Sequence, residues 1–384
     1  MRILHAIQSA DPTGGGPIEG IRQLVAVTQD DQANLIVSLD HPSSPFLAGF
    51  PVPVIALGPA SMLGYSPLLA PWMRANARSF DCVVIHGLWR YVSLGTWRGL
   101  RGGTTPYFVM PHGMLDPWFK KAYPLKHLKK WLFWPLTEYR VLRDATGVVF
   151  TCEEERVRAR KSFWLYRCNE IVGTQTINTP SGNPDAQREA FLSRHPELLG
   201  KRLLLFLSRI HRKKGCDLLV RAFAVIAQAH PDVHLVMAGP CADGWEADLR
   251  RMAEQLGVDK RITWTGMLAD DFKWGAFHAA EAFVLPSHQE NFGIAVAEAL
   301  ACGVPVLISD QVQIWREIVE DGAGFVERDS FSGTELLLRR WLELSSVKRR
   351  AMAALARPCF ERRFESGMAV DKMMSIFRQG AAAA

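Results

Sequence analysis

Two glutamates, Glu290 and Glu298, have seven residues between them and flank a predicted helix start. The segment VLPSHQENFGIAVAEALACGVPVLIS, from Val284 to Ser309, indicates a strand, a loop, a helix that stops at a glycine, and a second strand. The unpaired N–H groups and the positive dipole end of such a helix favour a phosphate. Because carboxylates accept hydrogen bonds from hydroxyls, the pair predicts a ligand with both phosphates and hydroxyls, such as a nucleotide sugar.

This segment resembles the retaining GT-B glycosyltransferases of the family 4 type, bacterial enzymes of exopolysaccharide, lipopolysaccharide and capsule synthesis. Their hallmark is a pair of glutamates separated by seven residues, and the continuation EALACGVPV matches as well. Without that context, two exposed acids would be the plainer interpretation. The resemblance assigns the sugar hydroxyls to one glutamate and the ribose hydroxyls to the other. The donor-binding residues it implies here are Glu290 (sugar), Glu298 (ribose), Asn291, and the backbone N–H groups of Phe292, Gly293 and Ile294.

A basic loop, HRKKG, follows the predicted strand Leu203 to Leu207. Arg209 and Lys214 match the arginine and lysine that bind the donor diphosphate in the resembled family. Fixed cations stabilise a diphosphate that gains negative charge as it leaves, so both residues are expected to be catalytic as well as donor-binding. Arg212 and Lys213 are better explained as a solvated turn.

Two glycine-containing segments are further donor candidates. Gly14, Gly15 and Gly16 precede a predicted helix, and glycines let the backbone approach a phosphate closely. The spacing fits neither a dinucleotide fingerprint nor a Walker loop, which excludes a NAD-dependent dehydrogenase as far as a sequence can. A flexible turn is the alternative, but the resemblance implies donor or acceptor contacts at Gly15 and Gly16. It places the nucleobase beside Gly266 and Met267.

Two histidines end predicted strands of the amino-terminal half. His86 and His112 are each followed by glycine, which permits the close approach of a ligand. His112 resembles the family's histidine near the transferred sugar and is expected to be catalytic. His86, Asp116 and Trp118 are expected to contact the acceptor, although a strand-end histidine is more often structural.

Metal-dependent transferases usually carry an Asp-x-Asp pair on the diphosphate, and this sequence has none. We therefore expect no metal ion and no cofactor. Seven cysteines occur without a C-x-x-C pair, which argues against a disulfide framework and a zinc site.

The length of 384 residues predicts two domains. Because the sequence lacks a signal peptide and an apolar run long enough for a membrane span, we expect a cytoplasmic protein. The net charge is +6. Much of the basic character is concentrated in the segment WFKKAYPLKHLKKWLFW, residues 118–134, where aromatic residues alternate with Lys120, Lys121, Lys126, Lys129 and Lys130.

This basic and aromatic pattern is typical of a helix that lies on an anionic membrane surface. The alternative is that the aromatic residues pack into the core while the lysines face water. Nucleic acid is a weaker candidate, because no binding motif accompanies the charge.

Alternating short apolar strands and longer helical stretches predict an α/β protein with two doubly wound, Rossmann-like domains facing a central cleft, as in GT-B. We expect an acceptor-binding domain over residues 1–178, a donor-binding domain over 179–358, and a helix over 359–384 that returns to the first domain. A long helix is expected over Lys126–Arg143, interrupted at Pro135, and a polar linker over Gly173–Gln187. Val172–Thr176 replaces the Pro-Asn-Gly turn that the family has at the domain junction.

These features predict a retaining, metal-independent glycosyltransferase that moves a hexose from a UDP- or GDP-sugar to a glycan acceptor. The acceptor is expected to be linked to a lipid, such as polyprenyl diphosphate, at the cytoplasmic face of the membrane, where the protein would be peripheral. One alternative is a nucleotide-sugar epimerase of the same fold, which needs no acceptor site. The other is a non-catalytic nucleotide-sugar-binding scaffold in an envelope assembly complex. The presence of Arg209, Lys214, Glu290 and Glu298 together argues against it, because a non-catalytic protein has no need of all four.

Overall fold

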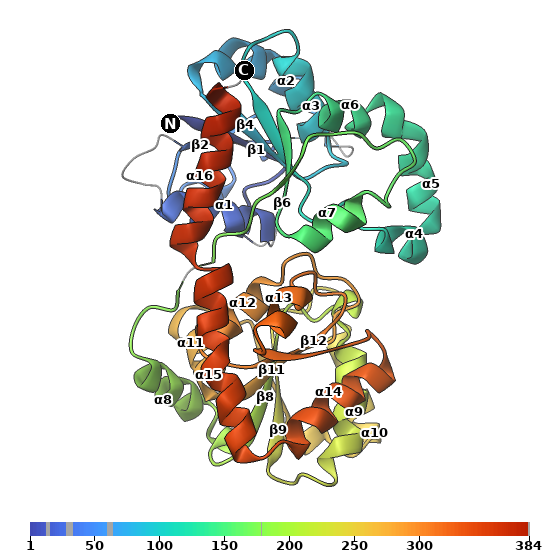
Figure 1. Cartoon of the computed structure of the whole chain (residues 1–384), viewed down its shortest axis with the longest axis vertical. Coiled ribbons are helices and arrows are strands. Elements are labelled where there is room, and N and C mark those ends of the chain that lie inside the picture. Colours follow the sequence, from blue (N-terminus) through green and yellow to red (C-terminus); the bar gives the residue numbers. More distant parts are fainter. Residues whose placement is uncertain (13–15, 28–33, 60–63, 178, 383–384) are drawn as a thin grey trace. The chain divides into compact units, whose positions relative to one another are not determined.

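The computed structural model describes residues 1–12, 16–27, 34–59, 64–177 and 179–382, and the chain forms two compact units (Figure 1). The first unit comprises Met1–Ile177 and Ser366–Ala384, and the second comprises Asn178–Glu365. The chain returns to the first unit at Ser366, later than the expected residue 359. The break between helices falls at Phe364 and Glu365, so the residues just after 359 still belong to a helix of the second unit.

The first unit is built on a parallel sheet with strand order β3-β2-β1-β4-β5-β6-β7. The central strands are buried on both faces, as the apolar runs in the sequence predict. Two short strands at the sheet edges were not predicted, because three residues carry too little pattern. The strands are β1 (Ile3–Ile7), β2 (Asn34–Ser38), β3 (Val54–Ala56), β4 (Cys82–His86), β5 (Tyr107–Met110), β6 (Gly147–Phe150) and β7 (Glu170–Val172).

The helices of the first unit cover this sheet. The expected helix from Lys126 to Arg143 is divided at Pro135 into α5, a 3₁₀ turn and α6, because proline cannot donate the backbone bond that continues a helix. The helices are α1 (Gly16–Val27), α2 (Leu69–Asn76), α3 (Tyr91–Leu100), α4 (Trp118–Ala122), α5 (Pro124–Phe133), α6 (Glu138–Arg143), α7 (Glu153–Ala159) and α16 (Ser366–Ala382). In the described part of the chain, no helix has the length and apolar character that a membrane crossing requires.

Helix α16 completes the core of the first unit although it lies at the far end of the sequence. Its Phe377 ring is fully buried and lies 5.1 Å from the ring of Phe108 on β5. The ammonium of Lys372 donates to the carbonyl of Gly173 at 3.1 Å. These contacts fasten the carboxyl-terminal helix to the sheet of the first unit.

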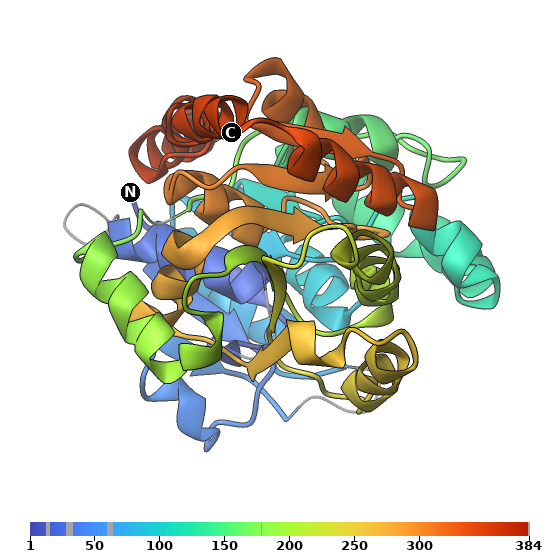
Figure 2. The ribbon, with the colours of Figure 1, turned by 90° about the horizontal axis from the view of Figure 1, so that it is seen from below.

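The second unit has a parallel sheet with strand order β10-β9-β8-β11-β12-β13, and helices flank it (Figure 2). Together with the first sheet, it confirms the predicted architecture of two Rossmann-like domains. Its strands are β8 (Arg202–Leu207), β9 (Val233–Ala238), β10 (Ile262–Gly266), β11 (Ala280–Leu285), β12 (Val306–Ser309) and β13 (Gly324–Glu327). Its helices are α8 (Pro184–Arg194), α9 (Cys216–Ala227), α10 (Glu246–Gln255), α11 (Asp270–Ala279), α12 (Ile294–Ala301), α13 (Trp315–Glu320), α14 (Phe331–Glu343) and α15 (Ser346–Arg363).

The polar segment predicted to be a linker over Gly173–Gln187 includes the start of a helix. Asn183 caps α8, because its side-chain oxygen accepts hydrogen bonds from the N–H groups of Asp185 and Ala186. Pro184 occupies the first helical position, where a backbone N–H would have no partner within the helix, so the missing N–H of proline costs nothing. The linker prediction was therefore wrong from residue 184 onward, because polar capping residues were interpreted as a loop.

The loop after β4 is held by a buried carboxylate. Trp89 has a left-handed φ of 68°, and its N–H donates to Glu138 on α6 at 3.0 Å. Ser93 donates to the same oxygen at 2.9 Å. Burial raises the pKa of Glu138 to about 7, despite the lowering effect of these hydrogen bonds.

This pKa predicts a pH-dependent term in stability. The folded state binds a proton at Glu138 more tightly than the unfolded state, whose carboxyl has a pKa near 4.5. The stabilisation is complete below that value and is lost as the pH rises through about 7. Relative to Glu138→Gln, the wild type should therefore lose on the order of 2 kcal/mol of unfolding free energy between about pH 5 and about pH 8. Urea denaturation measures this difference, and parallel pH profiles for the two proteins would show that Glu138 is ionised in the fold.

Candidate active site

The carboxyl ends of the second sheet bring distant loops together. The backbone of Gly239, after β9, approaches Ser208 so closely that an added Cβ would lie 1.9 Å from the carbonyl oxygen of Ser208. Gly215 has a left-handed φ of 66°, and an added Cβ there would lie 2.1 Å from the carbonyl oxygen of Pro286. The glycines therefore let the basic loop after β8 pack against the loops after β9 and β11.

The buried ammonium of Lys214 forms an ion pair with the carboxylate of Glu290. Burial alone would raise the pKa of Glu290, but the neighbouring cations, first Lys214 and then Lys213 and Arg209, together outweigh it, and the pKa lies below its usual value. Glu290 is therefore a carboxylate at neutral pH, able to accept hydrogen bonds but not to donate a proton. The loop that carries it is fixed by the Glu290 N–H, which donates to the Gln311 carbonyl, and by the Glu290 carbonyl, which accepts from Gln313.

Glu298 has a lysine partner of its own. Its carboxylate lies 2.8 Å from the ammonium of Lys273 on α11, and the Glu298 side chain is 9% exposed. Lys273 also lies 4.1 Å from the centre of the Trp274 ring. The sequence analysis missed Lys273, because an isolated lysine on another helix carries no motif.

Helix α12 begins beside these charges. Gly293 precedes it with a left-handed φ of 85°, and the helix runs from Ile294 to Ala301. Within the described part of the chain, the N–H groups of Ile294 and Ala295 have no hydrogen-bond partner. The Phe292 ring is buried against Phe364 at 5.5 Å, so only its backbone is available to a ligand.

The other donor candidates vary in exposure. Arg209 is exposed and has no ion-pair partner among the described residues. Gly266 has a left-handed φ of 68° at the end of β10, and the side chain of Met267 after it is 74% exposed. Gly16 is the exposed first residue of α1, whereas Gly15 lies outside the described residues.

Three histidines of the first unit are joined in a row. The Nε2 atom of His86 lies 3.1 Å from Nδ1 of His5, and Nδ1 of His86 lies 3.0 Å from Nε2 of His112. Because both ring nitrogens of His86 are engaged, it has none left for the acceptor contact that the sequence predicted. His112 has a left-handed φ of 50°, and the next N–H, of Gly113, donates to Glu155 at 2.6 Å.

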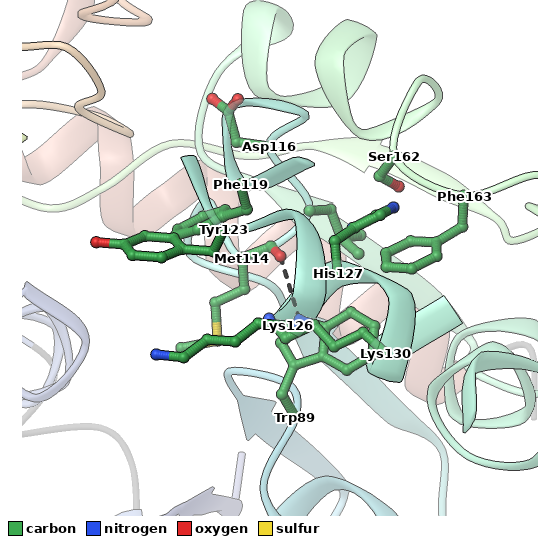
Figure 3. Close-up of a pocket in the computed structure, with 11 residues that line it drawn as sticks. Trp89, Met114, Asp116, Phe119, Tyr123, Lys126, His127, Lys130, Ser162 and Phe163 are labelled. Atoms are coloured by element: carbon green, nitrogen blue, oxygen red, sulfur yellow. Dashed lines mark hydrogen bonds between the residues drawn. The ribbon is translucent and has the colours of Figure 1, made fainter. Parts of the chain in front are cut away.

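A cavity of about 290 Å³ opens in the first unit (Figure 3). The ammonium of Lys130 lies 4.4 Å from the centre of the Trp89 ring and 5.6 Å from that of Phe119. Among the described residues it forms no salt bridge, although the Glu138 carboxyl is near enough to interact with it electrostatically. Burial lowers the pKa of Lys130 to about 8. The Asp116 carboxylate at this cavity accepts from the Trp118 N–H at 2.8 Å and lies 3.5 Å from Arg158. The lining residues are Trp89, Met114, Leu115, Asp116, Phe119, Tyr123, Lys126, His127, Lys130, Ser162 and Phe163.

Helix α5, which carries Lys130, exposes large apolar side chains. Both views place this helix at the edge of the first unit (Figures 1 and 2). Its exposed apolar residues are Leu125, Leu128, Trp131, Leu132 and Phe133. Lys129 of α5 and Lys121 of the preceding α4 are exposed, while Lys120 of α4 is partly buried and donates to the carbonyl of Lys161 at 2.6 Å. Trp134 at the end of the segment is fully buried, as the core-packing alternative expects, whereas the large apolar side chains of α5 are exposed.

Comparisons with known proteins agree with this architecture. Residues 15–166 match the model of the glycosyl transferase 4-like domain, and residues 187–355 match that of the glycosyl transferases group 1. The structure of Anabaena Alr3699/HepE in complex with UDP superposes with a TM-score of 0.80 at 16% identity, covering 99% of this chain and all of that one. At this identity, the likeness concerns the fold alone.

Curated relatives match over shorter stretches. The D-inositol 3-phosphate glycosyltransferase of Mycolicibacterium gilvum is 38% identical over 109 residues, which are 28% of this chain and 24% of that protein. The mannosylfructose-phosphate synthase of Agrobacterium fabrum is 32% identical over 123 residues, 30% of this chain and 27% of that protein. The chain thus spans about a quarter of the length of these relatives. The two domain models nevertheless match most of both sheets, in order along the chain, and the chain belongs to the GT-B glycosyltransferases of the family 4 type.

Proposed function

We propose that this protein is a retaining, metal-independent glycosyltransferase that moves a hexose from a nucleoside diphosphate sugar to a lipid-linked glycan acceptor in surface polysaccharide synthesis. The observation that carries the proposal is the Lys214–Glu290 ion pair beside the start of α12. The similarly folded Anabaena Alr3699/HepE, solved with UDP, supports a nucleotide donor.

The ammonium of Lys214 suits the diphosphate of the donor, and the carboxylate of Glu290 suits its sugar. An ammonium has three N–H donors, so Lys214 has hydrogen-bonding capacity for a diphosphate oxygen while it remains paired with Glu290. The unpaired N–H groups at the start of α12 and the exposed Arg209 add positive potential for the same oxygens. Glu290, held as a carboxylate, accepts hydrogen bonds from sugar hydroxyls.

In the proposed reaction, the bond between the anomeric carbon and the diphosphate oxygen breaks, and a bond to the acceptor oxygen forms on the same face. The departing phosphate oxygen takes the proton of the acceptor hydroxyl. Negative charge develops on the diphosphate, and Lys214 and Arg209 stabilise it without a metal ion. Neither glutamate acts as a covalent nucleophile in this scheme, and Glu298 holds the ribose hydroxyls.

The acceptor is assigned to the first unit. Aromatic faces at the cavity of Figure 3 suit a sugar ring, Asp116 suits its hydroxyls, and the ammonium of Lys130 suits a phosphate. Lys126 and Lys130 of α5 line this cavity. The exposed leucines and lysines of the same helix complement the apolar interior and negative surface of a membrane leaflet. A lipid-linked acceptor would then present its head group to the cavity while the protein rests on the membrane. The names of the two relatives refer to D-inositol 3-phosphate and to mannosylfructose phosphate, so a soluble acceptor phosphate is the specific alternative.

We expect donor turnover without added metal. The full chain is incubated in EDTA with UDP- and GDP-hexoses, with either phytanyl-diphosphate-linked sugars or inositol phosphate as acceptor. One donor should be consumed, NMR should show an anomerically retained product, and Glu290→Gln should reduce kcat about 100-fold. Glu320→Gln, an exposed acid of the same unit, is the matched control. Inversion, a strict need for a divalent ion, or no transfer to any acceptor would refute the proposal.

We also expect α5 to bind anionic membranes. Leu128→Glu puts a charge on its exposed face and should weaken binding to phosphatidylglycerol vesicles about tenfold in a flotation assay. Leu355→Glu makes the same change at an exposed leucine of α15 and should leave binding unaltered. Equal binding by both variants, or equal binding of the wild type to neutral phosphatidylcholine vesicles, would argue against a membrane role for α5.

A further inference from the structure

The row of histidines in the first unit ends at an amide in the core. The Nε2 atom of His5 lies 3.3 Å from the side-chain oxygen of Asn34. Asn34, His5 and His86 are buried, whereas His112 at the other end is partly exposed. The row therefore runs from the interior of the sheet, across β2, β1 and β4, to the loop after β5.

Each imidazole in this row is neutral. Burial lowers the pKa of His5 and of His112 to about 4. Burial, together with the two neighbouring histidines, lowers the pKa of His86 well below its ordinary value. A neutral imidazole has one N–H donor and one nitrogen acceptor, so the position of one proton decides the positions of the others.

The amide oxygen sets the direction of the row. It can only accept, so the proton of His5 is on Nε2 and its Nδ1 is an acceptor. His86 must then donate to His5 from Nε2, which leaves its own Nδ1 to accept from Nε2 of His112. The proton of His112 is consequently on Nε2, and its Nδ1 carries a lone pair.

The backbone at His112 is held as firmly as its ring. A left-handed φ is uncommon for histidine and persists where the surroundings enforce it. Glu155 supplies this restraint, because its carboxylate accepts from Gly113 at 2.6 Å and from the N–H and hydroxyl of Thr151 at 2.6 and 2.8 Å. Within the described part of the chain, Nδ1 of His112 has no hydrogen-bond partner.

We infer that Asn34, His5 and His86 are positioning residues, which fix His112 as the Nε2-protonated tautomer and so present its Nδ1 lone pair to the substrate. The inference rests on the proposed function and on the expectation, implied by the family resemblance, that His112 lies near the transferred sugar. It assigns a role to His5 and Asn34, and it makes His86 a link in the row instead of an acceptor-binding residue.

The tautomer determines which ligand group His112 can bind. A nitrogen lone pair accepts a hydrogen bond from a hydroxyl and repels an ionised phosphate oxygen. A neutral acceptor at this point therefore selects a sugar hydroxyl and adds no positive charge to the site. Turning the Asn34 amide around would reverse every hydrogen bond in the row and present an N–H, so one buried amide controls the polarity of an atom three side chains away.

The test is ¹⁵N NMR of the full chain labelled at histidine, with the His112 signals assigned by their loss in His112→Gln. In the wild type at neutral pH, Nε2 of His112 should be protonated and Nδ1 unprotonated. In Asn34→Leu, the direction of the row is no longer set, and His112 should populate both tautomers. Asn34→Asp, whose oxygens still accept, should restore the single tautomer. Asn76→Leu removes a side-chain hydrogen bond on α2 and is the matched control.

Kinetics give a second readout. With the donor hexose found by turnover, kcat/KM of Asn34→Leu should fall about tenfold, as for one uncharged hydrogen bond, and Asn76→Leu should not change it. A wild-type His112 that is protonated on Nδ1 or is an imidazolium overturns the inference without any variant, as does an unchanged tautomer in Asn34→Leu. The NMR measurement needs no substrate, so the two proposals can fail separately. If NMR shows the expected tautomer but no donor is turned over, the proposed function is refuted while the hydrogen-bonded row of histidines is still supported.

Discussion

The ion pair between Lys214 and Glu290 is the interaction on which the candidate site depends. It joins the loop after β8 to the loop after β11, two segments that are 76 residues apart in the chain. Lys214 is buried, whereas the Glu290 side chain is 20% exposed. Removing one partner of a fully buried pair typically costs about 3–5 kcal/mol, which is an upper value for this partly exposed pair. The close glycine contacts at Gly215 and Gly239 let the backbones approach far enough for the pair to form.

The same pair explains why one place suits both a diphosphate and a sugar. A cation without a partner would bind any anion, and a carboxylate without a partner would repel a diphosphate. Paired, they present positive and negative groups side by side, next to the unpaired N–H groups at the start of α12. The second pair, Lys273 with Glu298, holds another acceptor in the same unit. We therefore regard the charge pairing as the basis of the proposed donor recognition.

Much of this arrangement could be predicted from the sequence, because the chemistry is carried by local patterns. The strands around Glu290 and the helix that starts after Gly293 followed from apolar runs and turn residues. Lys214 followed from its match to the lysine of the resembled family. The partners Lys273 and Glu155, and the row from Asn34 to His112, could not be predicted in this way. They are brought together by tertiary packing between elements far apart in the chain, and the spacing of these residues in the sequence does not indicate that they are in contact. The start of α8 was missed for a different reason, since its Asn183-Pro184 cap is a local signal that was interpreted as a linker.

The most direct test of the account is the binding of UDP and GDP to the full chain in EDTA, measured by calorimetry for the wild type, Lys214→Gln and Lys213→Gln. The account predicts that one nucleotide binds without metal and that Lys214→Gln weakens it by roughly 10- to 100-fold, the usual value of a hydrogen bond to a charged group. Lys213→Gln, the neighbouring lysine, should bind nearly as the wild type does. Equal affinity in Lys214→Gln and the wild type, or no binding of either nucleotide, would contradict the claim that the Lys214–Glu290 pair forms the donor site.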